Sequence, residues 1–245
     1  MCAVEGNQAK CWGSNTDGKL GVNSGSAVLA SPVSAESDSG INFPSSISDM
    51  SGGDGFGCTI HTQSNDYACA GSHEFGQLGI NGPYGPGSFR QAFDSRQSFN
   101  GLGHDPDDVL VAVTSGATHS CLLTSWSRVY CWGENNAGEL GNGSTNYFVH
   151  SQPTSGQVIF GTSDFDILQV SAGRQYTCAL RFSGNVTCWG SNLFGTLGDS
   201  SWASTGSPAD ANNVPLSAPA TQIYTYATHA CALLNTGERW DLSTP

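Results

Sequence analysis

Four copies of one nine-residue pattern, Gly-x4-Gly-x-Leu-Gly, recur along this chain, and this recurrence limits the possible folds more than any other feature. The copies span residues 13–21, 71–79, 133–141 and 190–198. A pair of cysteines lies just upstream of each copy. Such regular self-similarity is typical of a repeat protein, in which a unit cannot bury its apolar face alone and packs against its neighbours.

The length of the repeating unit favours a β-propeller over other repeat architectures. Aligned on the first cysteine of each pair, the units begin at Cys2, Cys58, Cys121, Cys178 and Cys231. The steps between these positions are 53 to 63 residues, which is too long for leucine-rich or ankyrin repeats and fits one four-stranded propeller blade. We therefore predict a single repeat-built domain over residues 1–245, with four full units and a partial fifth.

Within a unit, the residue pattern predicts strands and almost no helix. In the fourth unit, Cys178 and Leu180 lie two positions apart, as do Val186 and Cys188, so these side chains share one face of a β-hairpin. The Ser-Gly-Asn sequence between the two pairs is typical of a turn, because glycine readily adopts a positive φ. No stretch of the chain shows a convincing helical period in its apolar residues.

The glycines and leucines of the nine-residue pattern are interpreted as structural. A strand that ends in Trp-Gly and then turns sharply requires close approach of two backbones and a left-handed φ. A phosphate-binding loop is the alternative, but no helix and no Lys-Ser or Lys-Thr pair accompanies these glycines. The pattern leucines, and the tryptophans before the first glycine, are expected to pack between adjacent blades; they are Leu20, Leu78, Leu140, Leu197, Trp12, Trp132 and Trp189.

The sequence Cys-Ala-Leu-x3-Gly-x-Val-x-Cys-Trp-Gly-x-Asn-x2-Gly-x-Leu-Gly, which begins at Cys178, resembles the repeat of the regulator of chromosome condensation family. The resemblance recurs four times, covers nearly the whole chain, and implies an all-β propeller, commonly of seven blades. This chain departs from the family by carrying cysteine pairs and by lacking a basic tail. In the fifth unit, Asp241 and Leu242 stand in place of the second cysteine and the Trp-Gly. We expect a partial or open ring, with a closed ring of five short blades as the alternative.

The charge of the chain argues against nucleic-acid binding. Its formal net charge is −12, and Lys10 and Lys19 are the only lysines among 245 residues. Such a surface repels phosphate backbones, so DNA or nucleosome binding is not expected. The chain also contains no apolar run that approaches the ~20 residues of a membrane-spanning helix, so no membrane insertion is expected.

Eight of the nine cysteines fall into four local pairs, and the ninth, Cys231, has no partner in its unit. Residues that face each other in a hairpin lie at a separation that a disulfide tolerates. We predict four disulfides, with buried free thiols or a metal site as the alternatives. Disulfides in this number indicate an oxidising compartment, so a secreted, extracellular protein is expected. The predicted pairs are Cys2 with Cys11, Cys58 with Cys69, Cys121 with Cys131, and Cys178 with Cys188.

Catalytic chemistry finds little support in the sequence. Serine, histidine and aspartate are plentiful, but they form no nucleophile elbow and no metal-ligand spacing. His119 and His229 occupy one repeat position, where Tyr176 and Phe56 stand in other units, and we interpret it as a packing or hydrogen-bonding position. The acidic segments 104–108 and 164–166 are interpreted as solvated loop charge rather than calcium sites. We expect no enzyme activity and no cofactor.

Four residues are candidate surface sites. Trp126 and Trp202 lie off the nine-residue pattern, in a turn and in a loop between strands, and are the candidate contacts for a partner, because exposed tryptophans often anchor interfaces. Asn142 and Asn185 begin sequons and are candidate glycosylation sites in a eukaryotic secretory pathway. The insertion 80–108, which carries three phenylalanines, is expected to cover a blade edge rather than to dock a partner.

These features favour a non-enzymatic, extracellular interaction or structural module. Its propeller rim or open blade ends would bind another protein or further copies of the chain. A guanine-nucleotide exchange factor for a small GTPase is the first alternative, because the family resemblance implies it, and it requires a cytosolic or nuclear setting. A carbohydrate-binding surface module is the second alternative, and only scattered aromatic residues support it.

Overall fold

The computed structural model describes residues 2–5, 8–21, 26–34, 47–61, 63–80, 89–90, 97–98, 105–145, 157–161, 166–209 and 211–242. Over these residues the chain consists of β-strands joined by turns and loops, with one short 3-10 helix, η1 (Thr16–Gly18). Within the same ranges, no helix is long and apolar enough to cross a membrane. The prediction of an all-β chain is confirmed.

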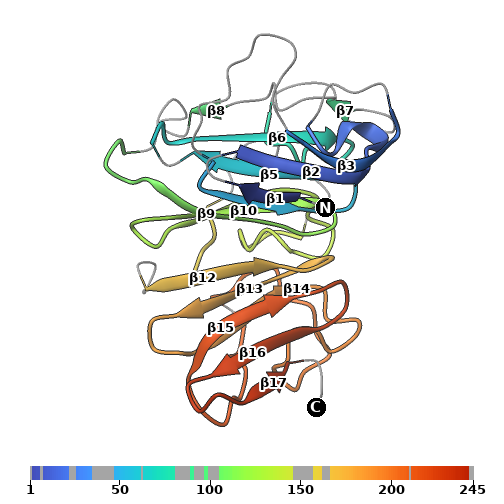
Figure 1. The fold of residues 1–245 in the computed structure, drawn as a ribbon. Coiled ribbons are helices and arrows are strands. Elements are labelled where there is room, and N and C mark those ends of the chain that lie inside the picture. Colours follow the sequence, from blue (N-terminus) through green and yellow to red (C-terminus); the bar gives the residue numbers. More distant parts are fainter. Residues whose placement is uncertain are drawn as a thin grey trace.

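The strands form successive antiparallel sheets, one for each repeat unit, and we call them blades 1 to 5 (Figure 1). Among the described residues, blade 2 has additional short strands at its outer edge, and the other blades have three strands each. The strands are β1 (Cys2–Glu5), β2 (Gln8–Ser14) and β3 (Val28–Ser34) in blade 1; β4 (Asp49–Gly52), β5 (Phe56–His61), β6 (Asp66–Ser72), β7 (Phe89–Arg90) and β8 (Gln97–Ser98) in blade 2; β9 (Leu110–Ser115), β10 (His119–Thr124) and β11 (Val129–Gly133) in blade 3; β12 (Ile167–Ala172), β13 (Tyr176–Arg181) and β14 (Val186–Gly190) in blade 4; and β15 (Ala220–Thr225), β16 (Ala230–Leu234) and β17 (Arg239–Asp241) in blade 5.

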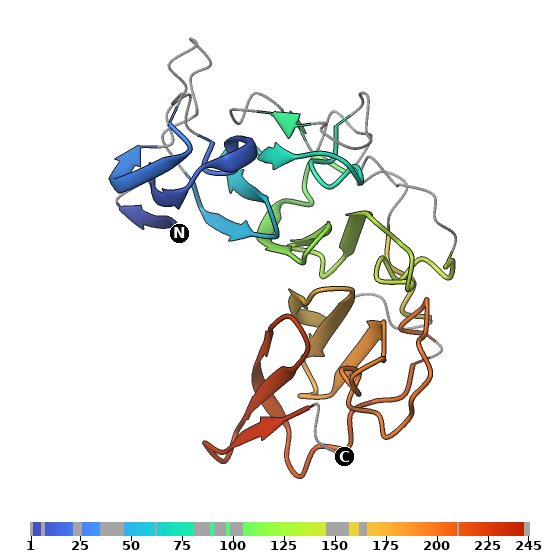
Figure 2. The ribbon, with the colours of Figure 1, turned by 90° about the vertical axis from the view of Figure 1, so that its right-hand side faces the viewer.

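The blades follow one another along an open arc (Figure 2). The first strands of blades 2 to 5 are β4, β9, β12 and β15, and each contacts the next, so they line the inner side of the arc. Blades 1 and 5 lie at the two ends, and in the described part of the chain no sheet joins them. The expected open ring is confirmed, and the closed five-bladed ring is not what forms.

The cysteine hairpins have the register that the residue pattern indicates. In blade 4, β13 and β14 pair antiparallel with Cys178 opposite Cys188 and Leu180 opposite Val186. The Ser-Gly-Asn turn joins these strands, and Gly184 has a φ of 84° in it. Blades 1, 2 and 3 place their cysteines opposite each other in the same way. Side chains that alternate between the two faces of a strand, together with a tight turn, determine which residues face each other across the hairpin. The register can therefore be predicted from the sequence.

The hydrophobic core lies between the blades. The face of blade 4 that carries Cys178 and Leu180 packs against blade 5, for example against Ile223. The corresponding face of blade 3, with Cys121, packs against Trp189 of blade 4, and blade 2 packs on blade 3 in the same way. Because the next blade covers the apolar face of each one, the repeats stabilise one another as stacked units.

The structure of blade 5 differs from that of the other blades at the positions where its sequence differs from the repeat. Asp241 lies opposite Cys231, in the place of the second cysteine, and Cys231 is a free, buried thiol. Leu242 stands in the place of the tryptophan; it is buried, and its backbone lies against Gly198. A leucine therefore fills the space between blades 4 and 5 that a tryptophan fills between earlier blades.

Candidate functional site

The predicted cysteine pairs are joined as disulfides in the structure: Cys2–Cys11, Cys58–Cys69, Cys121–Cys131 and Cys178–Cys188. The last three lie buried among the core residues between blades, whereas Cys2 is exposed. In the ranges that the structure describes, no cluster of His, Cys, Asp and Glu could hold a metal ion. The bonds therefore brace the scaffold from inside the blade interfaces, and this geometry favours disulfides over the alternative of buried free thiols.

The tryptophans of blades 3 and 4 attach each blade to the one before it. Trp132 donates from Nε1 to the carbonyl oxygen of Gln77 at 3.0 Å, and Trp189 donates to the carbonyl oxygen of Glu139 at 3.0 Å. Both indoles are fully buried. A β-carbon on Gly79 would lie 2.7 Å from Nε1 of Trp132, so the last glycine of the pattern makes room for the ring. The predicted packing of these tryptophans between blades is confirmed.

A role that sequence reasoning missed belongs to the asparagine at the third position of the pattern. Asn15, Asn135 and Asn192 each accept a hydrogen bond from the backbone N–H of the pattern leucine at 3.1 Å. Asn192 also donates from Nδ2 to the carbonyl oxygen of Ser201 at 2.9 Å. One side chain thus holds both the pattern loop and the loop that follows it. The recurrence of asparagine in three of the four copies was the signal that could have revealed this role.

A hydrogen-bonded chain of polar groups is buried between blades 3 and 4. Nε2 of His119 lies 2.9 Å from Oγ1 of Thr177, which donates to the carbonyl oxygen of Glu139 at 2.9 Å. Since the hydroxyl proton points to that carbonyl, Nε2 of His119 is the donor. Burial lowers the pKa of His119 to about 4, so the ring is neutral near pH 7. The hydrogen-bonding interpretation of this repeat position is confirmed for His119, whereas His229 is exposed and stacks on Tyr226 with ring centroids 4.7 Å apart.

The side chain of Glu139 is itself a buried titratable group in this interface. Its Oε2 accepts a hydrogen bond from the backbone N–H of Ala137 at 2.8 Å, and its Oε1 has no partner among the described residues. Burial raises the pKa of this carboxyl to about 7, and the negative charge of Glu134 adds to the effect. The charged form of Glu139 is therefore poorly solvated, so its ionisation opposes folding.

The acidic segment 104–108 is not only solvated charge, contrary to the prediction. The side chain of Asp108 is fully buried, although Asp105 is exposed. Oδ1 of Asp108 accepts from the backbone N–H of Trp126 at 3.0 Å, and Oδ2 lies 3.6 Å from the guanidinium of Arg128. Asp108 therefore fixes the turn between β10 and β11. Sequence reasoning missed this because the partners lie about 20 residues away in the chain.

The structure describes only part of the acidic segment 164–166 and of the insertion 80–108, for which the sequence analysis made predictions. His104 and Asp164 lie outside the described residues, as do Phe93 and Phe99 of the insertion 80–108. Asp166 forms an ion pair with Arg181, so this acidic segment is also anchored at its end. That the insertion covers a blade edge stays a prediction.

The structure places Trp126 and Trp202 on different blades and at opposite ends of them. Trp126 is 38% exposed in the turn between β10 and β11, and the guanidinium carbon of Arg128 lies 4.9 Å from its ring centroid. Trp202 is 75% exposed and lies in the loop after β14, at the end of blade 4 where Gly190 faces Tyr176. The two tryptophans are not brought together, and their role as partner contacts stays a prediction.

Two further exposed apolar side chains lie in the loop region of Trp202. Leu193 is 74% exposed and Phe194 is 62% exposed, directly after Asn192. Asn192 ties the two loops together, because its backbone N–H also donates to Oγ of Ser204 at 3.1 Å. The other copies carry Thr-Asp, Glu-Phe and Asn-Ala at these positions, so this apolar tip is specific to blade 4. We call Leu193, Phe194 and Trp202 the apolar patch of blade 4.

The two candidate glycosylation sites differ in accessibility. Asn185 is exposed in the turn between β13 and β14. Asn142 is half-buried, and its Oδ1 accepts a hydrogen bond from the backbone N–H of Ser144 at 3.1 Å. Modification at both positions stays a prediction.

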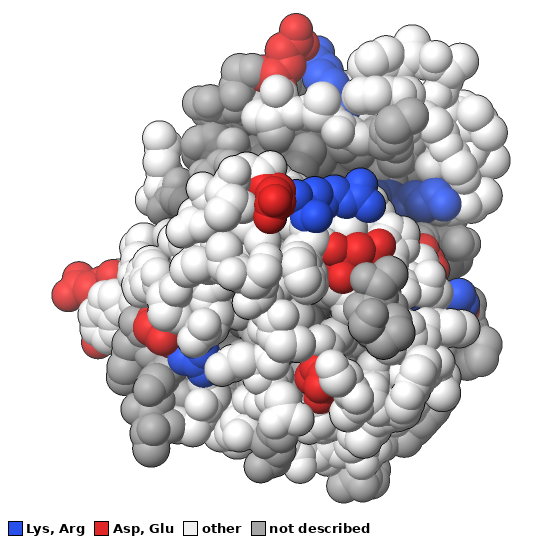
Figure 3. All heavy atoms as spheres, turned by 90° about the horizontal axis from the view of Figure 1, so that it is seen from below, with Lys and Arg blue, Asp and Glu red and all other residues white. Residues whose placement is uncertain are grey.

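Charged side chains are sparse on the molecular face seen in Figure 3, where acidic and basic groups lie scattered among uncharged residues. This matches the composition, in which Asp and Glu number 20 and Lys and Arg number 8. That the chain binds no nucleic acid stays a prediction.

Solved structures of other proteins share this architecture. The crystal structure of human WBSCR16 superposes with a TM-score of 0.78 over 96% of this chain and 61% of that chain, at 20% sequence identity. The structure of Prp20p from Saccharomyces cerevisiae superposes with a TM-score of 0.70 over 98% of this chain and 55% of that chain, at 14% identity. This chain therefore has the fold of slightly more than half of such propellers.

Sequence relatives match shorter stretches. The rat probable E3 ubiquitin-protein ligase HERC4 is 38% identical over 92 residues, which are 38% of this chain and 8% of the ligase. The human X-linked retinitis pigmentosa GTPase regulator is 32% identical over 139 residues, which are 57% of this chain and 12% of the regulator. The chain thus spans only a small part of these relatives.

Models of the regulator of chromosome condensation (RCC1) repeat match the middle of the chain, one over residues 127–180 and another over 110–139 and 167–196. These ranges contain the cysteine hairpins and pattern loops of blades 3 and 4. The neighbouring blades repeat the same hairpin register and the same disulfide. With the propeller neighbours described above, these matches show that residues 110–196 carry RCC1 repeats and that the chain is similar to the RCC1 repeat family of β-propellers.

Proposed function

We propose that this chain is a non-enzymatic protein-interaction module that presents the apolar patch of blade 4 on a rigid, disulfide-braced arc. The observation that carries the proposal is the exposure of Leu193, Phe194 and Trp202 on loops held by Asn192. Large apolar side chains on a fixed support lose little conformational freedom on binding, and such residues often anchor interfaces. Exposed apolar residues that gather in one place are typical of contact sites.

The relatives support a protein as the class of partner. Yeast RCC1 (Prp20) has been crystallised with Kap60 bound, and binding of Prp20p to Gsp1p and histones has been described. This chain shares only the fold with Prp20p, so we carry over the class of partner and none of these individual proteins. A protein partner or a further copy of the chain is proposed, without nucleic-acid binding and without membrane insertion.

We propose an extracellular or secreted location for this module, as one domain over residues 1–245. Four disulfides, three of them buried between blades, support an oxidising compartment, because reducing cytosol would keep these thiols free. The exposed sequon at Asn185 suits glycosylation in a eukaryotic secretory pathway.

A guanine-nucleotide exchange factor is the second candidate function. Its support is the match to the human X-linked retinitis pigmentosa GTPase regulator over 57% of this chain. The two candidates need different redox settings, so the state of the cysteines in the natural source separates them. Mass spectrometry with and without reductant would find four bonded pairs for the extracellular module. Free thiols at these positions would favour the exchange factor.

The interaction proposal is tested by altering the apolar patch. We expect the double variant Leu193→Gln, Phe194→Gln to capture at least tenfold less of any protein that the wild-type chain captures from culture medium of its source. Phe182→Gln is the matched control, because Phe182 is 64% exposed on the other end of the same blade. Equal capture by the patch variant and the control would overturn the proposal.

A further inference from the structure

The turns that join the first two strands of blades 2, 3 and 4 are bonded to one another across the blades. The backbone N–H of Asp54 in blade 2 donates to the carbonyl oxygen of Ala117 in blade 3 at 3.2 Å. The N–H of Ala117 donates in the same way to the carbonyl oxygen of Arg174 in blade 4 at 3.3 Å. Because the three residues occupy the same position in their turns, the turns form one hydrogen-bonded row.

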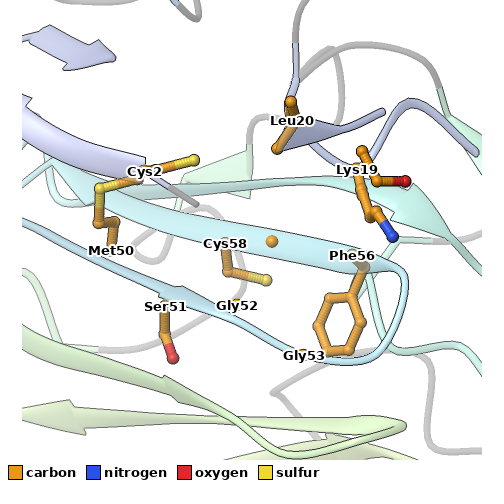
Figure 4. A pocket seen from close by; sticks show the side chains of 11 residues that line it. Cys2, Lys19, Leu20, Met50, Ser51, Gly52, Gly53, Phe56 and Cys58 are labelled. Carbon is orange, nitrogen blue, oxygen red and sulfur yellow. The ribbon is translucent and has the colours of Figure 1, made fainter. Parts of the chain in front are cut away.

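A glycine precedes each of these three residues and lets the turns approach closely. A β-carbon on Gly53 would lie 2.2 Å from the carbonyl oxygen of Gly116, and one on Gly116 would lie 2.2 Å from the carbonyl oxygen of Gly173. The ring of Phe56 also lies against Gly53, at the end of the β4–β5 hairpin (Figure 4). The row is therefore tightly packed, and it offers a ligand a surface that is already in place.

A cavity of about 240 Å³ lies over this row. At about 30 Å³ for each water-sized group, it holds roughly eight non-hydrogen atoms. This is the size of an amino acid or a dipeptide, and it is too small for a nucleotide or an oligosaccharide. The residues that line the cavity come from the corresponding turns of blades 2 to 5, and they are 52–54, 115–117, 172–174 and 225–227.

Two side chains of opposite charge line the cavity, Asp54 and Arg174. Both are exposed, and in the part of the chain that the structure describes neither forms an ion pair. Ala117 stands between them in the row, and hydrogen-bonded neighbouring backbones lie about 4.8 Å apart, so the backbones of the two charged residues are about 10 Å apart. A carboxylate and a guanidinium at this spacing can bind two separate groups of one ligand.

We propose that this cavity binds a short peptide of about two residues with both ends free. Its ammonium group pairs with Asp54 and its carboxylate pairs with Arg174, whose planar guanidinium suits a carboxylate. An extended dipeptide is about 7 Å long, so its two ends reach the two side chains. A ligand of one charge fits less well, because Asp54 repels an anion and Arg174 repels a cation.

Diglycine is the probe, because it carries the two charges and no side chain. It is added to the intact, disulfide-bonded chain, and backbone amide chemical shifts are followed by NMR. We expect saturable shifts at the amides of Ala117 and Arg174, with an affinity in the millimolar range that is usual for so small a ligand. N-acetyl-diglycine lacks the ammonium and diglycine amide lacks the carboxylate, so each is expected to bind about fivefold more weakly.

Two neutral variants assign each charge of the ligand to its residue. In Asp54→Asn, diglycine and N-acetyl-diglycine are expected to bind equally, because the partner of the ammonium is gone. In Arg174→Gln, diglycine and diglycine amide are expected to bind equally, because the partner of the carboxylate is gone. Glu238→Gln is the matched control, since Glu238 is exposed in the turn between β16 and β17 and does not line the cavity; it is expected to keep both preferences.

The proposed site is distinct from the apolar patch of blade 4, because none of the three patch residues lines the cavity. The double variant Leu193→Gln, Phe194→Gln is therefore expected to bind diglycine as the wild type does. Loss of protein capture with diglycine binding intact concerns the patch alone, so failure of the interaction proposal and failure of this one are distinguishable.

Three results would overturn the proposal. The first is no saturable shift with diglycine, and the second is equal binding of diglycine and its two blocked forms by the wild type. The third is a preference for the free ammonium that persists in Asp54→Asn, which would place that group elsewhere on the protein.

Discussion

The buried carboxyl of Glu139 makes the stability of this protein depend on pH in a predictable direction. Burial raises the pKa of the group from 4.5 to about 7 in the folded state. The folded state therefore holds the proton more tightly than the unfolded chain does. The stabilisation is complete below pH 4.5, the unfolded value, and is lost as the pH rises through about 7. At about 1.4 kcal/mol for each pKa unit, the loss is about 3 kcal/mol.

Glu139→Gln tests this directly, because the amide has nearly the shape of the protonated acid and keeps an oxygen for the N–H of Ala137. We expect the variant to match the wild type at pH 4 and to exceed its free energy of unfolding by up to about 3 kcal/mol at pH 8. Urea unfolding at a series of pH values, with disulfides intact, measures the difference. The lowered pKa of His119 changes the stability in the opposite direction as the pH rises. This effect is the same in both proteins, so it cancels in the difference between their free energies of unfolding. A difference that does not change between pH 4 and pH 8 would refute the reasoning.

Three further predictions follow from the blade interfaces. Trp189→Phe removes the hydrogen bond to the carbonyl of Glu139 and leaves part of the buried indole space empty, so we expect a loss of about 2–3 kcal/mol in urea unfolding; no loss would contradict the role of this residue between the blades. The Cys2–Cys11 disulfide should be reduced before the others, because Cys2 is exposed and the remaining pairs are buried; limited reduction with alkylation and peptide mapping measures the order, and simultaneous reduction speaks against it. Asn192→Ala should cost about 1–2 kcal/mol, because the N–H of Leu197 loses its acceptor, and should speed proteolysis beside Trp202; unchanged cleavage would count against this anchor.

Much of the fold follows from local patterns in the sequence. The hairpin register, the turn at Gly184 and the cysteine pairs depend on residues about ten positions apart, where strand periodicity and turn geometry leave one arrangement. The packing of Trp132 and Trp189 also follows, because the repeat predicts that equivalent residues meet equivalent neighbours.

The candidate site could be predicted from the sequence less well than the fold. The sequence marks Trp202 as a candidate contact but does not mark Leu193 and Phe194, because their positions lie inside a pattern whose glycines and leucine have a structural role. The burial of Asp108 and of Glu139 was not predicted either. Asp108 is held by groups of another turn, and linear spacing does not show which loop covers a charge.

The sequence by itself determined the repeating unit, its strands, its cysteine pairs and its resemblance to the RCC1 repeat, because each depends on short-range spacing. Only the tertiary structure decided that the core lies between blades and that inner strands are linked through side chains such as Ser171. These properties depend on how the blades are placed around the arc. That placement is set by packing between residues more than 50 positions apart, such as Gln169 and Ile223.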